Sequence, residues 1–231
     1  MRHYFALLKK VIKYLPAINR KTLSVNFKNL AFKDAIRLPI LLSHRVKISD
    51  NSGLIVIDAP LSTGMIRIGF GDVGIFDHKR TRTILQNPGK IIFHGTASIG
   101  FGSSISIGNN GVLELGNNFA ITAKSAIMCQ KHIVFGNDCL ISWDCLFMDS
   151  DFHTILDKTN NMINHPKDII VGNHVWIGCR CLILKGTEIA DHIVIGANST
   201  VTNVLQHQNS VYSGNPARCV KEDITWEEKM E

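Results

Sequence analysis

The chain of 231 residues contains no run of about 18 uncharged apolar residues, the length that a membrane-spanning helix requires. Its first residues also lack the long apolar stretch and the small-residue cleavage site of a secretory signal. We therefore expect neither a transmembrane helix nor a secretory leader, and we predict a cytoplasmic protein. The apolar content of 45% is enough for a substantial core.

Disulfide and zinc patterns are absent as well. Cys179 and Cys181 form a Cys-x-Cys sequence, but no second pair with zinc-ligand spacing accompanies it among the six cysteines. We expect reduced thiols, as in the cytosol, and no metal site.

Residues 171–206 lack the apolar periodicity of an amphipathic helix and instead repeat every six positions. The fifth position of each unit is usually small, which suits the buried Cys139, Cys145 and Cys181. A period of six is typical of a triangular parallel β-helix, in which each unit forms one side and three units close a coil. The alternative, a β-sandwich, would not produce six consecutive matches. The units open at Val171, Ile177, Ile183, Ile189, Ile195 and Val201.

Units of the same length recur before residue 171, with phase shifts of two residues. We interpret these shifts as short insertions at the corners, which a solenoid tolerates because each coil contacts only its neighbours. Residues 48–95 are strand-rich but less regular. We predict an all-β protein with a parallel β-helix over 48–215, a helical segment over 1–47 and a short C-terminal helix or tail over 216–231.

The N-terminal segment 1–47 contains 11 basic residues and one acidic residue, Asp34, whereas the rest of the chain has a net charge of −4. Pro16 would end an amphipathic helix near residue 15. One interpretation is an interfacial helix on an anionic membrane, at its inner face. The other is a helix that packs on the end of the β-helix and covers a strand edge. No recognised nucleic-acid module accompanies the charge. The helical spacing is carried by Tyr4, Leu8, Val11, Leu15 and Ile18.

The clean repeat is interrupted between Phe147 and Val171, where a polar segment (148–170) predicts a loop that projects from one corner. His153 lies at the root of this loop. A histidine is suited to take a proton near neutral pH, and a nearby carboxylate, Asp149 or preferably Asp151, could orient its ring. The alternative is a solvated loop histidine without a role.

Three runs resemble the hexapeptide-repeat acyltransferases, in particular the galactoside and maltose acetyltransferases and the sugar O-acetyltransferases of capsule and O-antigen synthesis. The resemblance covers about residues 97–221. It implies a left-handed β-helix, a homotrimer with active sites between neighbouring chains, acetyl-CoA as donor and a catalytic histidine at His153. The runs are Val171-Gly-Asn-His-Val-Trp-Ile-Gly, Ile195-Gly-Ala-Asn-Ser-Thr-Val-Thr and Gly214-Asn-Pro-Ala-Arg-Cys-Val-Lys.

The resemblance also implies a donor site built partly from backbone along one edge of the β-helix. Family members commonly have lysine where this chain has Asn203, so we expect the contact to a CoA phosphate to be weaker or to come from Lys185, Arg218 or Lys221. Trp176 would wall the pantetheine channel or pack between subunits. Thr122 and Gln130 fall where polar contacts to the acceptor are expected. The remaining donor-site residues implied are Cys179, Ala197, Thr202, Arg218 and Lys221.

The resemblance therefore implies an acetyl-CoA-dependent O-acetyltransferase that acts on a sugar hydroxyl in polysaccharide biosynthesis, with no metal in the chemistry. Three alternatives stay open. The first is N-acetylation of an amino sugar, for which the same base serves. The second is a non-catalytic trimeric scaffold. The third is a γ-class carbonic anhydrase, which needs three histidines around a metal; Met148 and Lys158 stand where the second histidine of a short-spaced pair would be expected.

Overall fold

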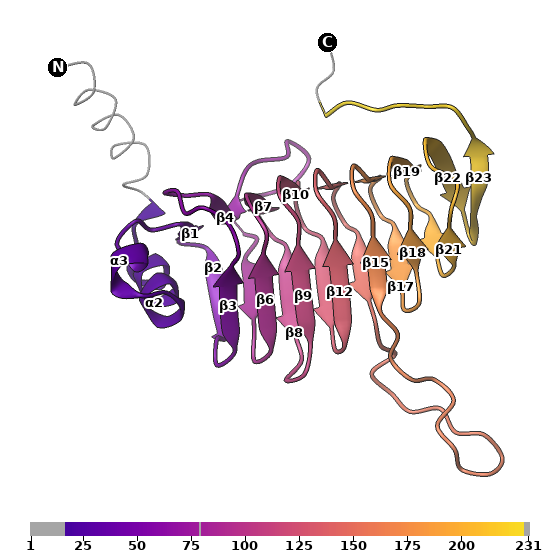
Figure 1. Cartoon of the computed structure of the whole chain (residues 1–231), viewed down its shortest axis with the longest axis horizontal. Coiled ribbons are helices and arrows are strands. Elements are labelled where there is room, and N and C mark those ends of the chain that lie inside the picture. Colours follow the sequence, from indigo (N-terminus) through magenta and orange to yellow (C-terminus); the bar gives the residue numbers. More distant parts are fainter. Residues whose placement is uncertain (1–16, 79, 229–231) are drawn as a thin grey trace.

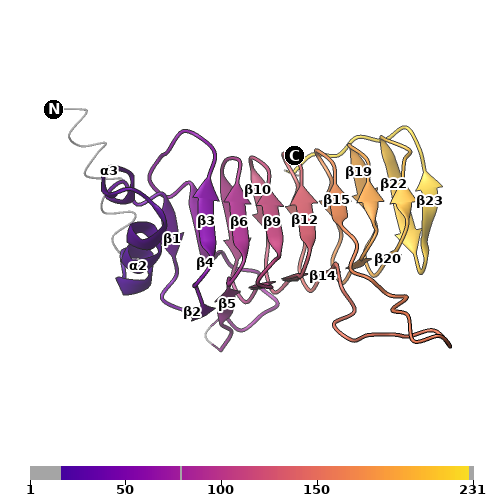
Figure 2. The ribbon, with the colours of Figure 1, turned by 60° about the horizontal axis from the view of Figure 1, so that its bottom comes forward.

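The computed structural model describes residues 17–78 and 80–228. Residues 40–214 form a left-handed parallel β-helix of three sheets, which confirms the predicted fold class (Figures 1 and 2). The β-helix begins at Ile40 and not at residue 48, because the first two strands already pair in register with the later coils.

The three sheets take consecutive strands in turn. Sheet A contains β1 (Ile40–Leu42), β4 (Ile66–Phe70), β7 (Ala97–Gly100), β10 (Phe119–Ile121), β13 (Leu140–Ile141), β16 (Trp176–Ile177), β19 (Ile193–Ile195), β22 (Ser210–Gly214) and β23 (Ala217–Lys221). Sheet B contains β2 (Val46–Asp50), β5 (Thr83–Gln86), β8 (Ser104–Ile107), β11 (Ala126–Cys129), β14 (Leu146–Met148), β17 (Leu182–Leu184) and β20 (Thr200–Val201). Sheet C contains β3 (Leu54–Ile57), β6 (Lys90–Phe93), β9 (Val112–Leu115), β12 (His132–Phe135), β15 (Ile169–Val171), β18 (Glu188–Ile189) and β21 (Val204–Leu205).

Corner insertions lengthen the early coils, as predicted. Ile99, Ile121, Ile141, Ile177 and Ile195 stack in register on sheet A, at separations of 22, 20, 36 and 18 residues. The separation of 18 is three six-residue units, and the separation of 36 contains the extruded loop. The two-residue phase shifts of the repeat have a second cause. Residues two positions apart on one strand both point into the core, so the repeat can be counted from either of them.

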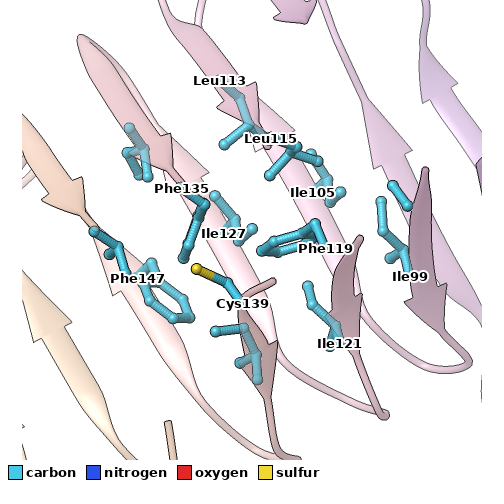
Figure 3. Close-up of a cluster of buried hydrophobic side chains, with 14 of the residues drawn as sticks. Ile99, Ile105, Leu113, Leu115, Phe119, Ile121, Ile127, Phe135, Cys139 and Phe147 are labelled. Carbon is cyan, nitrogen blue, oxygen red and sulfur yellow. The ribbon is translucent and has the colours of Figure 1, made fainter. Parts of the chain in front are cut away.

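The core is a continuous stack of inward side chains (Figure 3). Phe119, Phe135 and Phe147 contact in sequence, with ring centroids 4.9 and 5.1 Å apart. Cys145 and Cys181 fill tight corner positions, and each thiol donates to a glycine carbonyl 3.1 Å away. The small fifth position of the repeat is therefore a buried corner position.

Two helices cover the N-terminal end of the β-helix: α2 (Arg20–Asn29) and α3 (Phe32–Ala35). The Thr22 hydroxyl accepts from the N–H of Leu42 at 3.0 Å, and the Asn26 amide donates to the carbonyl of Ile40 at 2.7 Å. These bonds satisfy the edge of β1, which would otherwise stay unpaired. The helix predicted from Tyr4 to about residue 15 lies outside the described residues. No helix in the described ranges has the length and hydropathy needed to cross a bilayer.

The predicted C-terminal helix is wrong. Residues 217–221 form β23, which pairs antiparallel with β22 and covers the open edge of sheet A at the last coil. The following residues run back along the β-helix (Figure 1). There the Trp226 ring stacks on His174, with centroids 4.3 Å apart, and its Nε1 donates to the His174 carbonyl at 3.0 Å.

Candidate active site

The extruded loop leaves the corner between sheets B and C, after β14, and returns at β15 (Figure 1). Its root is held by Asp149, whose buried carboxylate accepts from the backbone N–H groups of Gln130 at 2.7 Å and Lys131 at 2.8 Å. The Lys167 N–H donates to the Asp149 carbonyl at 3.0 Å and joins the two ends of the loop. Both carboxylate oxygens of Asp149 thus accept hydrogen bonds from the backbone of the preceding coil. Asp149 has a structural role and does not make the predicted contact to the His153 ring.

Asp151 likewise does not bond to the imidazole in this structure. Its carboxylate accepts from the Lys185 ammonium at 2.6 Å and from the Asn164 amide at 2.8 Å. The bond from Lys185, and then that from Asn164, hold the pKa of Asp151 below its usual range. The Asn164 amide nitrogen also donates to the His153 carbonyl at 2.7 Å. Asp151 therefore acts on His153 through its backbone, by way of Asn164.

Asn164 closes the loop in a second way. Its side-chain oxygen accepts from the Ile155 N–H at 2.7 Å, so one buried amide connects both sides of the loop root. No sequence signal marks this residue, because Asn164 lies in a polar segment with no periodicity. A fixed backbone on both sides of His153 is the kind of support that preorganises a catalytic group.

His153 opens into a cavity of about 290 Å³. The preceding residue, Phe152, has φ of 59°, a left-handed conformation that is unusual for a bulky side chain. Backbone strain of this kind is often found at functional sites, where the surrounding structure enforces it. The cavity is lined by Gln130, Ser150, Phe152, His153, Thr154, Met162, Asn164 and Pro166.

Gln130 also lines a second cavity, of about 330 Å³, that continues along the same corner toward the N-terminal end. Both cavities are lined by amide and hydroxyl groups, which suit hydrogen bonding to a polar ligand. Gln130 therefore lines the same cavity as His153. Thr122 lines a different cavity, of about 580 Å³, by sheet A. The cavity of about 330 Å³ that Gln130 lines has as its full lining Gln86, Pro88, Ser106, Ile107, Gly108, Asn109, Asn110 and Gln130.

The residues assigned to the donor do not form one cluster within a single chain. Cys179 and Ala197 lie at the corner between sheets A and B, because each falls between a strand of sheet A and the next strand of sheet B. Thr202 and Asn203 lie at the corner between sheets B and C, as do Lys185 and the loop root. Arg218 and Lys221 are exposed on β23 of sheet A.

Trp176 lies on the outer face of sheet A. Its Nε1 donates to the Ser142 hydroxyl at 3.2 Å, and its ring is 6.0 Å from that of Trp226. Trp176 thus packs against the C-terminal tail of its own chain, whereas the predicted packing was between subunits. Lys185 is bound to Asp151, so a contact to a phosphate would compete with that ion pair.

The outer face of sheet B becomes apolar in its C-terminal half. Outward side chains of β11, β14 and β17 align across the strands in two rows. This apolar face separates the corner with His153 from the corner with Cys179 and Ala197. The rows are Ala126, Leu146 and Leu182, and Met128, Met148 and Leu184.

Residues 168–203 match the family "Bacterial transferase hexapeptide (six repeats)". A polysialic acid O-acetyltransferase from Neisseria meningitidis is 39% identical over 99 residues, which are 42% of this chain and 46% of that protein. Galactoside O-acetyltransferase from Escherichia coli (strain K12) is 41% identical over 70 residues, 30% of this chain and 33% of that protein. The chain thus spans less than half the length of these relatives.

The crystal structure of the polySia specific acetyltransferase NeuO has the same fold, with a TM-score of 0.55 and 24% identity over 80% of this chain and 90% of that one. The predicted resemblance to hexapeptide-repeat acyltransferases is confirmed by these similarities. Within the described residues, no three histidine, cysteine, aspartate or glutamate side chains are grouped as metal ligands.

Proposed function

We propose that this hexapeptide-repeat protein is an acetyl-CoA-dependent O-acetyltransferase that acylates a sugar hydroxyl in surface-polysaccharide biosynthesis. The observation that carries the proposal is His153, held at a fixed loop root and open to a cavity lined by polar side chains. The relatives named O-acetyltransferases support the same reaction.

His153 acts as general base and then as general acid. It takes the proton of the acceptor hydroxyl while the oxygen attacks the thioester carbonyl of acetyl-CoA. A backbone N–H stabilises the oxyanion of the tetrahedral intermediate. The C–S bond then breaks, the imidazolium protonates the leaving thiolate, and the products are the acetyl ester and CoA. The Asn164 amide holds the histidine backbone in place.

The site is completed by a second copy of the chain. His153 lies at one edge of sheet B, whereas Cys179 and Ala197 lie at the other, so one chain does not bring acceptor and donor together. Burial of the apolar face between the two edges would drive association. We propose a homotrimer in which the His153 corner of each chain meets the Cys179 corner of its neighbour.

Cations bind the phosphates of the donor. Arg218 and Lys221 are exposed and serve this purpose, together with the backbone near Thr202 and Asn203. Lys185 stays with Asp151 at the loop root. The six free thiols, four of them buried, agree with a cytoplasmic reaction.

A mixing experiment tests the shared site. His153→Ala removes the base at one corner, and Ala197→Trp blocks the donor at the other. Each variant alone should release little CoA thiol from acetyl-CoA in the presence of acceptor. Trimers reassembled from an equal mixture should regain part of the wild-type rate, because some sites then combine two intact corners. Mixtures as inactive as the parents, although subunits exchange, would contradict a site between chains.

The acceptor is identified by mass spectrometry of sugar pools incubated with enzyme and labelled acetyl-CoA. A base-labile acetyl ester is expected. A stable amide would instead indicate N-acetylation of an amino sugar. The absence of any labelled product and of thiol release would favour a non-catalytic scaffold.

A further inference from the structure

The N-terminal end of the β-helix carries an unusual concentration of exposed apolar side chains. We name residues 17–38, which include α2 and α3, the cap. Its inner side, with Thr22 and Asn26, is fully buried against β1. Its outer side has no described partner, although Phe27 and Phe32 contact one another with ring centroids 5.7 Å apart. The exposed apolar residues are Ile18, Leu23, Phe27, Phe32 and Ile36, the most exposed being Phe32 at 73%.

The cap and the residues beside it are strongly basic. Residues 17–47 contain seven lysines and arginines and one acidic residue, Asp34. Next to the cap, a cavity of about 630 Å³ is lined by cationic groups, and no carboxylate lines it among the described residues. Lys21, on α2, belongs to both the cap and this cavity. The cavity is lined by Lys21, His44, Arg45, Val46, Lys47, Ile48, Arg80 and Arg82.

We infer that the cap is a peripheral membrane-binding surface for anionic lipid. Exposed aromatic and aliphatic side chains beside a basic region are the combination that binds a bilayer interface: the apolar groups enter the headgroup boundary and the cations attract lipid phosphates. An apolar protein partner would not explain the basic cavity, and a soluble anion would not explain the exposed phenylalanines. The inference concerns the end of the β-helix away from β23 and does not depend on the proposed acetyl transfer.

Vesicle flotation with the full chain tests this inference. Wild type should float with vesicles of phosphatidylcholine that contain about 30% phosphatidylglycerol, which is enough for a negative surface potential. It should not float with vesicles of phosphatidylcholine alone. The double variant F27S/F32S should lower the partition coefficient by about tenfold or more, because two exposed rings no longer enter the interface. Lys47→Gln with Arg82→Gln should lower it by about fivefold for each cation lost.

The matched control removes exposed apolar side chains elsewhere: I170S/V204S, on the outer face of sheet C, should bind as wild type. Circular dichroism melting identifies any variant that is misfolded. Equal flotation of F27S/F32S and wild type would overturn the inference, as would equal binding to neutral and anionic vesicles. The remaining experiment is a titration with inorganic phosphate. Binding of phosphate without flotation would assign the basic cavity to a soluble ligand and would also overturn the inference.

Discussion

The Lys185 ammonium lies 2.6 Å from the Asp151 carboxylate and connects the extruded loop to the coil that follows it. The two residues are 34 positions apart in the sequence, but they meet because the long loop begins and ends at one corner of the β-helix. The same carboxylate holds Asn164, which in turn holds the His153 backbone. The ion pair therefore positions the proposed base without contacting it.

Breaking this ion pair should lower kcat more than it raises the KM for the donor. We expect Asp151→Asn and Lys185→Gln each to reduce kcat about tenfold, since small displacements of a catalytic group are costly. Because both act through one contact, the double variant should lose no more than either single variant, as a double-mutant cycle of steady-state rates would show. Losses that multiply in the double variant would mean that the two side chains act independently.

His153→Ala should lower turnover by about 10²–10⁴-fold, the usual contribution of general acid–base catalysis. Affinity for CoA, measured by calorimetry, should be unchanged, because the imidazole acts in the chemical step. His165→Ala is the matched control: this histidine is exposed on the same loop but does not line the cavity. Comparable losses in both variants would indicate that the loop, and not the imidazole of His153, is responsible.

A charge on the apolar face of sheet B should dissociate the proposed trimer. Leu146→Glu combined with Leu182→Glu places two carboxylates where the face would be buried. We expect monomers by sedimentation velocity and loss of thiol release. Ile170→Glu, on the outer face of sheet C, should leave the assembly unchanged. If the double variant stays trimeric, another face forms the interface.

Cys179 should become protected when CoA binds, since the proposed donor site lies at its corner. The thiol is partly exposed, whereas burial raises the pKa of Cys139 to about 12 and keeps that thiol protonated and inert. In a Cys219→Ser background, we expect one fast-reacting thiol toward a thiol-specific reagent and at least about a tenfold slower reaction in saturating CoA. An unchanged rate would place the donor elsewhere.

Acid should weaken a carboxylate–imidazole ladder on sheet C. Glu114 lies 2.8 Å from the Nε2 of His94 and 2.9 Å from that of His132, and these hydrogen bonds lower the pKa of Glu114 below its ordinary value of 4.5. A depressed carboxyl pKa contributes stability above pH 4.5 that is lost as the pH falls through the folded-state pKa.

Thermal unfolding at several pH values checks this sign. Glu114→Gln should be less stable than wild type at pH 7 by no more than about 1 kcal/mol, because the group is near the surface. The difference in stability between Glu114→Gln and wild type should vanish below the folded-state pKa of Glu114. Glu188→Gln, exposed on the same sheet, is the control and should change little at either pH. A difference that is as large below the folded-state pKa of Glu114 as at pH 7 would contradict the assignment.

The architecture follows from the repeat pattern of the amino-acid sequence alone. An aliphatic residue every six positions predicts the β-helix, its small corner positions and the inward stack, because each coil repeats one local pattern of alternating side chains. The interruption after Phe147 predicted the extruded loop and His153 at its root. Residues 1–47 were predicted to be basic and helical, and the described helices begin at Arg20.

The surroundings of His153 and the path of the C-terminal tail depend on contacts between residues far apart in the sequence. Gln130 and Asp149 are 19 residues apart, Asp151 and Lys185 are 34 apart, and His174 and Trp226 are 52 apart, yet each pair is in contact. Such contacts depend on how coils of 18 to 36 residues stack, and no local pattern encodes coil length at the corners. For the same reason β23, predicted as a helix, became a strand: the edge that it covers exists only once the last coil is in place.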